Sequence, residues 1–475
     1  MTTSRTPTPW AALPVLVAGA FMVVLDFFIV NVALPSIATD LHAGESSLEW
    51  IVAGYGLSFA AFLILAGRLG DRLGRRRVYA FGLALFTAAS AACGLAPDAT
   101  TLVVARILQG LAGGIVMPQV LSIINVTYRD EEYARALSIY GLALGLAAIG
   151  GQVIGGALVE VNLGGLNWRT CFLINVPIGA VALALTPRLV PESRAPSRAK
   201  LDLLGADLLA VGLVAVLLPL IEGRQQGWPL WNWISFFVAA DMLILFVLHQ
   251  RHLSRRGDDP VLDLTLFRER AFTAGLFAQL LLACAQASFF VYFALFLQQG
   301  RGLGPLEAGL VFSILAVAYV ATSGPAPQLA ARFGRAVVAV GGLALAGGLG
   351  LLALAVSDGG VDGSLLALVP GMLLVGAGIG LCYTPLTSTV LSHVAPERAG
   401  AASGALSTTQ QVGYALGVAI TGLLFFGEAG DGIAHAFEVS LLQLGVLGLG
   451  IVAATRFLPR GATAHAVPEA AVAHA

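Results

Sequence analysis

The stretch GRLGDRLGRRR, Gly67 to Arg77, decides the fold because it places five arginines and one aspartate in a short turn between two apolar runs. Arginines at this density pair with anionic lipid headgroups and hold a loop on the cytoplasmic face of a membrane. The glycines Gly67, Gly70 and Gly74 allow the backbone to turn sharply between two helices. We therefore interpret the stretch as a cytoplasmic loop between two membrane-spanning helices.

The composition is that of an integral membrane protein. Of the 475 residues, 57% are hydrophobic and only 11% are charged, against about 25% charged residues in soluble domains. The net charge of -1, with basic residues dispersed over many short loops, excludes a nucleic-acid partner. The single lysine, Lys200, follows no glycine-rich loop, which excludes a phosphate-binding loop and direct use of a nucleotide. We expect no cofactor, and neither a disulfide nor a metal site at the isolated cysteines Cys93, Cys171, Cys284 and Cys382.

Fourteen apolar segments approach the roughly 20 residues that span a bilayer. They are 12–37, 49–69, 78–97, 101–125, 135–160, 168–190, 203–222, 231–250, 272–298, 306–331, 336–356, 364–391, 399–426 and 436–457. No small-residue cleavage site follows the first segment, so we expect it to stay in the protein. Of the 26 basic residues, 22 fall on the side of Gly67 to Arg77, whereas Arg169, Arg224 and Arg301 fall on the other side and Arg106 lies within a segment. The even number of segments and the positive-inside rule place both termini in the cytoplasm.

An internal repeat divides the chain into two halves. LAARFGR, Leu329 to Arg335, repeats LGDRLGR, Leu69 to Arg75, with Ala331 where the first copy has Asp71. Parallel repeats are typical of two-bundle membrane proteins, and two of the fourteen segments, flanked by polar linkers, are left over between the halves. We therefore expect a six-helix bundle at 1–190, a linker with two additional membrane-spanning helices at 191–270, a second six-helix bundle at 271–457 and a cytoplasmic tail at 458–475.

Several motifs occur in order along the chain. They are LDFFIVNVALPSI (Leu25 to Ile37), WIVAGYGL (Trp50 to Leu57), RILQGLAGG (Arg106 to Gly114), GGQVIGG (Gly150 to Gly156) and NWRTCFLINVPIG (Asn167 to Gly179). With these motifs the chain resembles the major facilitator superfamily, and within it the fourteen-helix drug/proton antiporters of the multidrug efflux family. The resemblance implies an all-α integral membrane fold of two six-helix bundles plus two inserted linker helices, with both termini cytoplasmic. Gln152 stands where this family usually has a proline that kinks the helix, and Phe28 stands where it usually has threonine.

Asp26 and Arg106 are the candidates for proton coupling. Asp26 lies near the middle of the first segment, where an ionisable group is costly and by default functional, and burial favours the neutral form of a carboxyl. At about 1.5 Å per residue the two residues differ in depth by roughly 8 Å, a gap that the long arginine side chain can cover. We predict a charge pair that protonation of Asp26 releases. The alternatives are a permanently hydrogen-bonded structural acid and an arginine that snorkels to the outer headgroups. Asp241, in the inserted helices, is the second proton candidate, although a partner there or an oligomer contact also explains it.

Polar and aromatic residues on the inner helix faces suit a lipophilic ligand. The predicted substrate cavity consists of Asn31, Gln109, Gln152, Gln279, Gln286, Tyr383, Gln411 and Tyr414. For each of these side chains, hydrogen bonding or packing between helices is the alternative, and Gln109 also lies one turn from Arg106.

The arginine-rich loop is the predicted conformational gate. Because Ala331 replaces the acid in the second copy of the repeat, Asp71 has no counterpart. We predict that Asp71 latches the first bundle to the cytoplasmic ends of the second bundle in the outward-open state. The gate residues are Gly67, Asp71, Arg72, Gly74, Arg75 and Arg76.

The resemblance and these residues together predict a secondary active transporter that exports small, lipophilic drugs or natural products in exchange for protons. Its expected partners are a small-molecule substrate, protons and the lipid bilayer. A proton-independent metabolite transporter and a non-transporting membrane sensor are the alternatives, whereas no nucleophile, base and oxyanion set indicates an enzyme. Twenty-five arginines against one lysine indicate a GC-rich bacterial genome, and hence a multi-pass protein of the bacterial inner (cytoplasmic) membrane. The resemblance to multidrug efflux proteins implies a role in antibiotic resistance.

Overall fold

The computed structural model describes residues 9–194, 202–256, 258, 260, 262–392 and 399–458. Within them the chain forms α-helices, short 3-10 helices and one π-helical turn, and no β-strand. The predicted tail at 458–475 lies outside the described residues except for Leu458, and so does Lys200 of the polar linker.

The helices fall into three groups along the chain. The N-terminal group comprises α1 (Ala12–Asp40), α2 (Glu45–Leu73), α3 (Arg75–Gly94), α4 (Ala99–Thr127), α5 (Asp130–Val161), α6 (Arg169–Leu173) and α7 (Asn175–Leu189). The inserted pair comprises α8 (Leu203–Glu222) and α9 (Leu230–Arg256). The C-terminal group comprises α10 (Arg270–Leu295) with the π-helical turn η4 (Phe296–Gly300), α11 (Pro305–Ser323), α12 (Ala326–Phe333), α13 (Ala336–Gly359), α14 (Leu365–Ser392), α15 (Ala399–Glu428) and α16 (Ile433–Ala454).

The number of membrane-spanning helices agrees with the prediction. Thirteen helices or joined helices in the described chain are long and apolar enough to cross a bilayer, and α6 with α7 counts as one of them. Helix α5 is the fourteenth span, bent by 43° between Glu131–Ala148 and Gly150–Val161. The all-helical membrane fold is therefore confirmed.

One predicted helix is broken. The segment 306–331 was expected to be continuous, but α11 ends at Ser323 and α12 starts only after Gly324 and Pro325. Proline supplies no backbone N–H and disfavours helical geometry in the residue before it, so the hydrophobic run continues while the helix does not.

The turn in the arginine-rich loop is made by one glycine and not by three. Gly67 and Gly70 lie inside α2, where Gly70 leaves room for the side chain of Gln119 from α4. Only Gly74, with φ of 110°, has left-handed backbone geometry, and Gly334 (φ of 57°) ends α12 at the corresponding place in the second repeat. The repeat is thus visible as two helices that each end on such a glycine.

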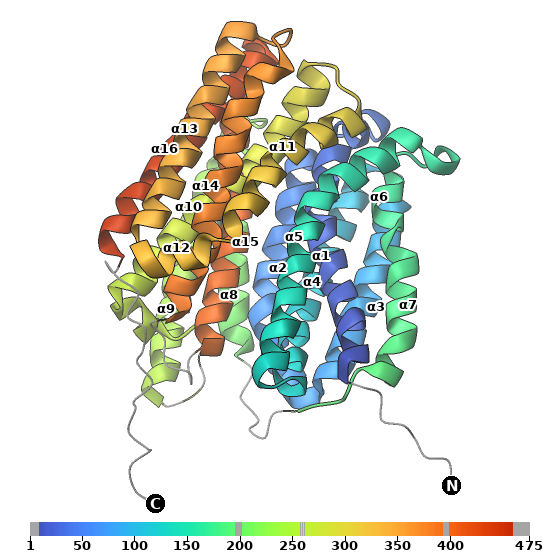
Figure 1. The fold of residues 1–475 in the computed structure, drawn as a ribbon, viewed down its shortest axis with the longest axis vertical. Coiled ribbons are helices and arrows are strands. Elements are labelled where there is room, and N and C mark those ends of the chain that lie inside the picture. Colours follow the sequence, from blue (N-terminus) through green and yellow to red (C-terminus); the bar gives the residue numbers. More distant parts are fainter. Residues whose placement is uncertain are drawn as a thin grey trace, which may run out of the picture.

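The two large groups stand side by side in Figure 1, blue to green and yellow to red. Helix α2 packs on α15 and α5 packs on α11 across the junction, while α8 packs on both α2 and α15. In this view α1 starts, and α16 ends, at the lower end of each helix (Figure 1). We call the end that carries Gly67 to Arg77 the arginine-rich end, and the opposite end the far end.

The groups touch in their far halves. Ala53 and Leu57 of α2 share an apolar cluster with Ala415 and Ala419 of α15 and with residues of α8. On the other side of the junction, a Cβ added to Gly309 of α11 would collide with the backbone of α5. The structure therefore shows the conformation in which the far end is closed.

Candidate functional site

A buried polar cluster surrounds Asp26 in the middle of α1. Its carboxylate forms an ion pair with Nη1 of Arg106 from α4, and both side chains are fully buried. Oδ1 of Asp26 accepts hydrogen bonds from Nε2 of Gln109 and from Nδ2 of Asn175, each at 2.8 Å. Both amides also donate to Oγ of Ser90 at 3.0 Å. Helices α1, α3, α4 and α7 are thereby joined around one carboxylate.

The guanidinium of Arg106 is held on several sides. Nε donates to the carbonyl oxygen of Ile51 at 3.0 Å, and Nη1 donates to Oε1 of Gln109 at 2.8 Å. Cζ lies 4.2 Å from the ring centroid of Tyr55, a cation–π contact. A buried ion that loses its counter-charge is strongly destabilised. Protonation of Asp26 therefore favours a rearrangement that gives Arg106 another partner or access to water.

The structure brings together the two residues predicted from depth and chemistry, Asp26 and Arg106. Gln109 lies three residues from Arg106 on the same face of α4, and both ends of its amide are engaged by the pair, so it does not line an open cavity. Ser90 and Asn175 were not predicted. Asn175 lies within the motif NWRTCFLINVPIG. A polar amide within an apolar span could have marked it as a candidate site residue.

Five of the predicted cavity residues have a buried amide oxygen with no hydrogen-bond partner among the described residues. They are Asn31, Gln152, Gln279, Gln286 and Gln411. Nε2 of Gln152 donates to the carbonyl oxygen of Phe28 at 3.1 Å and holds α5 on α1. Tyr383 and Tyr414 are half-buried. An unpaired buried amide oxygen costs about 1–3 kcal/mol, a cost that a donor from a ligand or a water molecule offsets.

Aromatic rings from both large groups meet at the junction. The ring centroid of Phe27 on α1 lies 5.0 Å from that of Tyr414 on α15, and that of Phe28 lies 5.5 Å from that of Phe290 on α10. Gln411 precedes Tyr414 by three residues and so shares its face of α15. The rings of the two groups thus pack against each other in this conformation, and the predicted substrate cavity stays a prediction.

The predicted gate is tied to its own half of the chain. Asp71 accepts two hydrogen bonds from Arg75, at 2.7 and 3.0 Å, and the two residues form an ion pair. Arg76 lies 3.7 Å from the carboxylate of Glu192, which follows α7, while Arg72 is exposed. The predicted latch concerns the opposite conformation, with the far end open, and stays a prediction.

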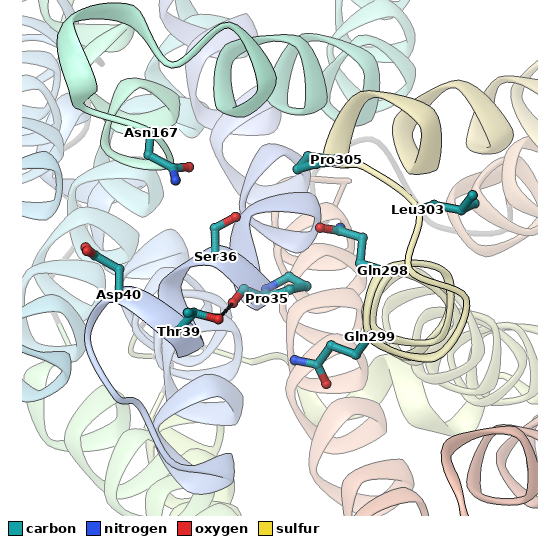
Figure 2. A pocket seen from close by; sticks show the side chains of 9 residues that line it. All are labelled: Pro35, Ser36, Thr39, Asp40, Asn167, Gln298, Gln299, Leu303 and Pro305. Atoms are coloured by element: carbon teal, nitrogen blue, oxygen red, sulfur yellow. Dashed lines mark hydrogen bonds between the residues drawn. The ribbon is translucent and has the colours of Figure 1, made fainter. Parts of the chain in front are cut away.

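A polar hollow of about 480 Å³ lies at the far end, between the end of α1 and the connection from η4 to α11 (Figure 2). Its lining residues are Pro35, Ser36, Thr39, Asp40, Asn167, Gln298, Gln299, Leu303 and Pro305. One turn deeper along α1, the carbonyl oxygen of Val32 accepts a hydrogen bond from Nε2 of Gln298 at 2.9 Å. This hollow is a vestibule on the far side of the closed junction.

Comparisons with known proteins agree with this arrangement. The family model described as Major Facilitator Superfamily matches residues 16–418. A probable actinorhodin transporter from Streptomyces coelicolor is 38% identical over 89% of this chain and 73% of that protein. The multidrug resistance protein Stp from Mycobacterium tuberculosis is 37% identical over 85% of this chain and 73% of that protein.

Two further matches extend the comparison. A tetracenomycin C resistance and export protein from Streptomyces glaucescens is 32% identical over 89% of this chain and 77% of that protein. Among solved structures, a POT family transporter in complex with a thioalcohol-conjugated peptide superimposes with a TM-score of 0.68 over 93% of this chain and 95% of that chain. Its sequence identity of 15% makes it evidence for the fold alone.

Proposed function

Because the chain belongs to the Major Facilitator Superfamily and is therefore a membrane transporter of small molecules and not an enzyme, we propose that it exports lipophilic drugs or natural products in exchange for protons. The single observation that carries the proton exchange is the buried ion pair of Asp26 and Arg106. The export direction and the substrate class rest on the named roles of the relatives. The aromatic junction of Phe27, Phe28, Phe290 and Tyr414 supports a lipophilic, ring-containing substrate.

Asp26 binds and releases the exchanged proton in this proposal. With the far end closed, Asp26 is ionised and paired with Arg106, and the substrate binds from the arginine-rich end. Opening of the far end releases the substrate and admits a proton to Asp26. The neutral carboxyl no longer balances the charge of Arg106, so the contacts among α1, α3, α4 and α7 change. The far end then closes, the arginine-rich end opens, and Asp26 releases its proton on that side of the membrane.

The regions of the chain have separate tasks in this scheme. The bundles at 1–190 and 271–457 rock about the junction, the insert at 191–270 spans it, and the arginine-rich loop closes the cytoplasmic side through Asp71. The arginine-rich end faces the cytoplasm of a bacterial cell, since the positive-inside rule applies to its short loops.

Uptake into inverted membrane vesicles tests the proposal. The probes are actinorhodin and tetracenomycin C, and the driving force is an imposed pH gradient with the vesicle interior acidic. We expect the wild type and the control Asp207→Asn, which changes an exposed acid of α8, to accumulate at least one probe until a protonophore collapses the gradient. Asp26→Asn should lose gradient-driven accumulation.

Two results contradict the proposal in different ways. Full gradient-driven accumulation by Asp26→Asn removes Asp26 from the coupling. Wild-type accumulation that is unaffected by the protonophore replaces proton exchange with proton-independent transport.

A further inference from the structure

A second buried carboxyl, Glu49, lies at the closed far end and has no part in the Asp26 cluster. Glu49 is one turn into α2 and is 6% exposed. It faces Gly422 of α15, where an added Cβ would collide with the carboxyl of Glu49 and with the hydroxyl of Tyr292 from α10. Glu49 therefore lies against two helices of the C-terminal group, at the surface along which the two groups must separate when the far end opens.

The charged groups around Glu49 leave it without a cation. Glu222 of α8 is an acid with an electrostatic effect on Glu49, and Glu222 accepts a hydrogen bond from Nε1 of Trp50 at 3.0 Å. Arg224, just beyond α8, forms an ion pair with Glu45 and donates to the carbonyl oxygen of Phe426 at 3.1 Å.

The remaining polar neighbours are also occupied. The hydroxyl of Tyr292 donates to the carbonyl oxygen of Val418 at 2.8 Å. Arg106 of α4 donates to the carbonyl oxygen of Ile51, two residues after Glu49 on α2, but its charge is paired with Asp26. Oε2 of Glu49 has no hydrogen-bond partner among the described residues. An ionised carboxylate in such a site is costly, because neither a donor nor an opposite charge compensates its desolvation.

We propose that Glu49 is a second proton-binding site, which takes up a proton when the far end closes and gives it back to the same side when the far end opens. In the closed junction Glu49 is neutral beside Gly422 and Tyr292. When α2 and α15 separate, water reaches the carboxyl and it ionises. This inference rests on the proposed alternation between two open states, but it assigns Glu49 a role that is separate from proton exchange at Asp26.

The sign of the pH effect follows from linkage. The closed state binds one more proton at Glu49 than the open state, so acid on the far side favours closure and alkali favours opening. One such group changes the ratio of open to closed molecules by at most about tenfold per pH unit. Export into an acidic medium would then be followed by rapid closure of the emptied far end.

Spin-label distances across the far end test the proposal. Cysteines placed at Gly44 and Gly430, where an added side chain meets nothing within 4 Å, mark the far ends of α2 and α15, while the four native cysteines are buried. Double electron–electron resonance on the full chain in lipid nanodiscs, from pH 5 to pH 8.5, measures the populations of short and long distances.

We expect the wild type to shift toward long distances as the pH rises, by up to about tenfold per pH unit in the population ratio. Glu49→Gln, which mimics the protonated side chain, should keep the short distance and lose this shift. Glu49→Asp, which still titrates, should retain it, and so should the control Asp98→Asn, which changes an exposed acid that caps α4.

The proposal is overturned if the wild type shows no shift or if Glu49→Gln shifts as the wild type does. The short distance in Glu49→Gln at low pH reports that the variant is folded. The same variants are also measured with Asp26→Asn, so that a proton at Asp26 cannot contribute; the shift that Glu49 causes should persist there and be absent with Glu49→Gln. Failure of the proposed function is seen separately, in full gradient-driven transport by Asp26→Asn.

Discussion

Replacing Arg106 by glutamine should destabilise the fold, because it leaves the carboxylate of Asp26 buried without its counter-charge. The ion pair is completely enclosed, with both side chains 0% exposed, and removal of one partner of a buried pair typically costs about 3–5 kcal/mol. Arg106 also donates to Ile51 and Gln109, and these hydrogen bonds from a charged donor add to the cost of losing its side chain. We expect Arg106→Gln to lower the free energy of unfolding by about 3–5 kcal/mol at neutral pH.

Neutralising Asp26 in the same molecule should restore most of that loss. The double variant Asp26→Asn with Arg106→Gln contains no buried charge at this site. The carboxamide oxygen of Asn can still accept from Gln109 and Asn175, so only about 1–2 kcal/mol of hydrogen bonding is lost. Adding Asp26→Asn to Arg106→Gln should thus raise the free energy of unfolding by about 2–3 kcal/mol. Asp26→Asn alone leaves Arg106 buried without its counter-charge and should also cost about 3–5 kcal/mol, so the two changes should be far from additive.

Reversible unfolding in mixed detergent micelles, followed by tryptophan fluorescence, gives the four free energies of this double-mutant cycle. The single variant Arg106→Gln should also become more stable as the pH falls, because protonation of Asp26 removes the unpaired charge. Additive free energies, with the double variant as unstable as the sum of the single variants, would refute the reasoning.

Three further predictions concern other parts of the fold. Asp202 caps α8 and accepts hydrogen bonds from His249 and Gln250 of α9. Burial alone would raise the pKa of Asp202. These bonds and the one from the backbone N–H of Gly205 outweigh burial, so the pKa lies below its ordinary value. Asparagine caps a helix as well as aspartate does, but Asp202→Asn removes the negative charge that these bonds stabilise and should cost about 0.5–1.5 kcal/mol at neutral pH. This difference in unfolding free energy should vanish as the pH falls through the lowered folded-state pKa of Asp202. Gly422→Ala should push α15 away from α2 and lengthen the spin-label distance across the far end at every pH; an unchanged distance would show that the contact is not tight. Asp71→Asn should lower the rate of probe accumulation in vesicles while changing the unfolding free energy by less than about 1 kcal/mol, and an unchanged rate would leave the loop as a membrane anchor only.

The spans could be predicted because hydropathy and length dominate helix formation in a bilayer. All fourteen predicted segments correspond to helices or joined helices of the structure, since backbone polar groups in lipid must be satisfied within the helix. Hydropathy did not predict the break at Gly324 and Pro325, because both residues are compatible with a hydrophobic run. Only the missing backbone N–H of proline interrupts the helix there.

The candidate site was predictable where a residue is chemically out of place. Asp26 and Arg106 are conspicuous as charges within apolar segments, and the structure places them in contact. Asn175 and Ser90 are common polar residues whose burial beside Asp26 depends on how four helices pack, which no spacing within one helix reveals. The burial of Glu49 could not be predicted, because an acid near the end of a span is usually a surface residue. Glu49 is buried only because α15 packs over it in the folded protein.

Exchange itself can be measured in the reverse direction. Purified protein is reconstituted into liposomes that contain a pH-sensitive dye, and an outward gradient of whichever probe the vesicles accumulate, actinorhodin or tetracenomycin C, is imposed without a pH gradient. Exchange at Asp26 predicts that wild-type protein acidifies the lumen as the probe leaves, and that Asp26→Asn abolishes this proton flux whether or not the probe still moves. Probe efflux by the wild type with no change of luminal pH, or an equal proton flux in Asp26→Asn, would contradict the account.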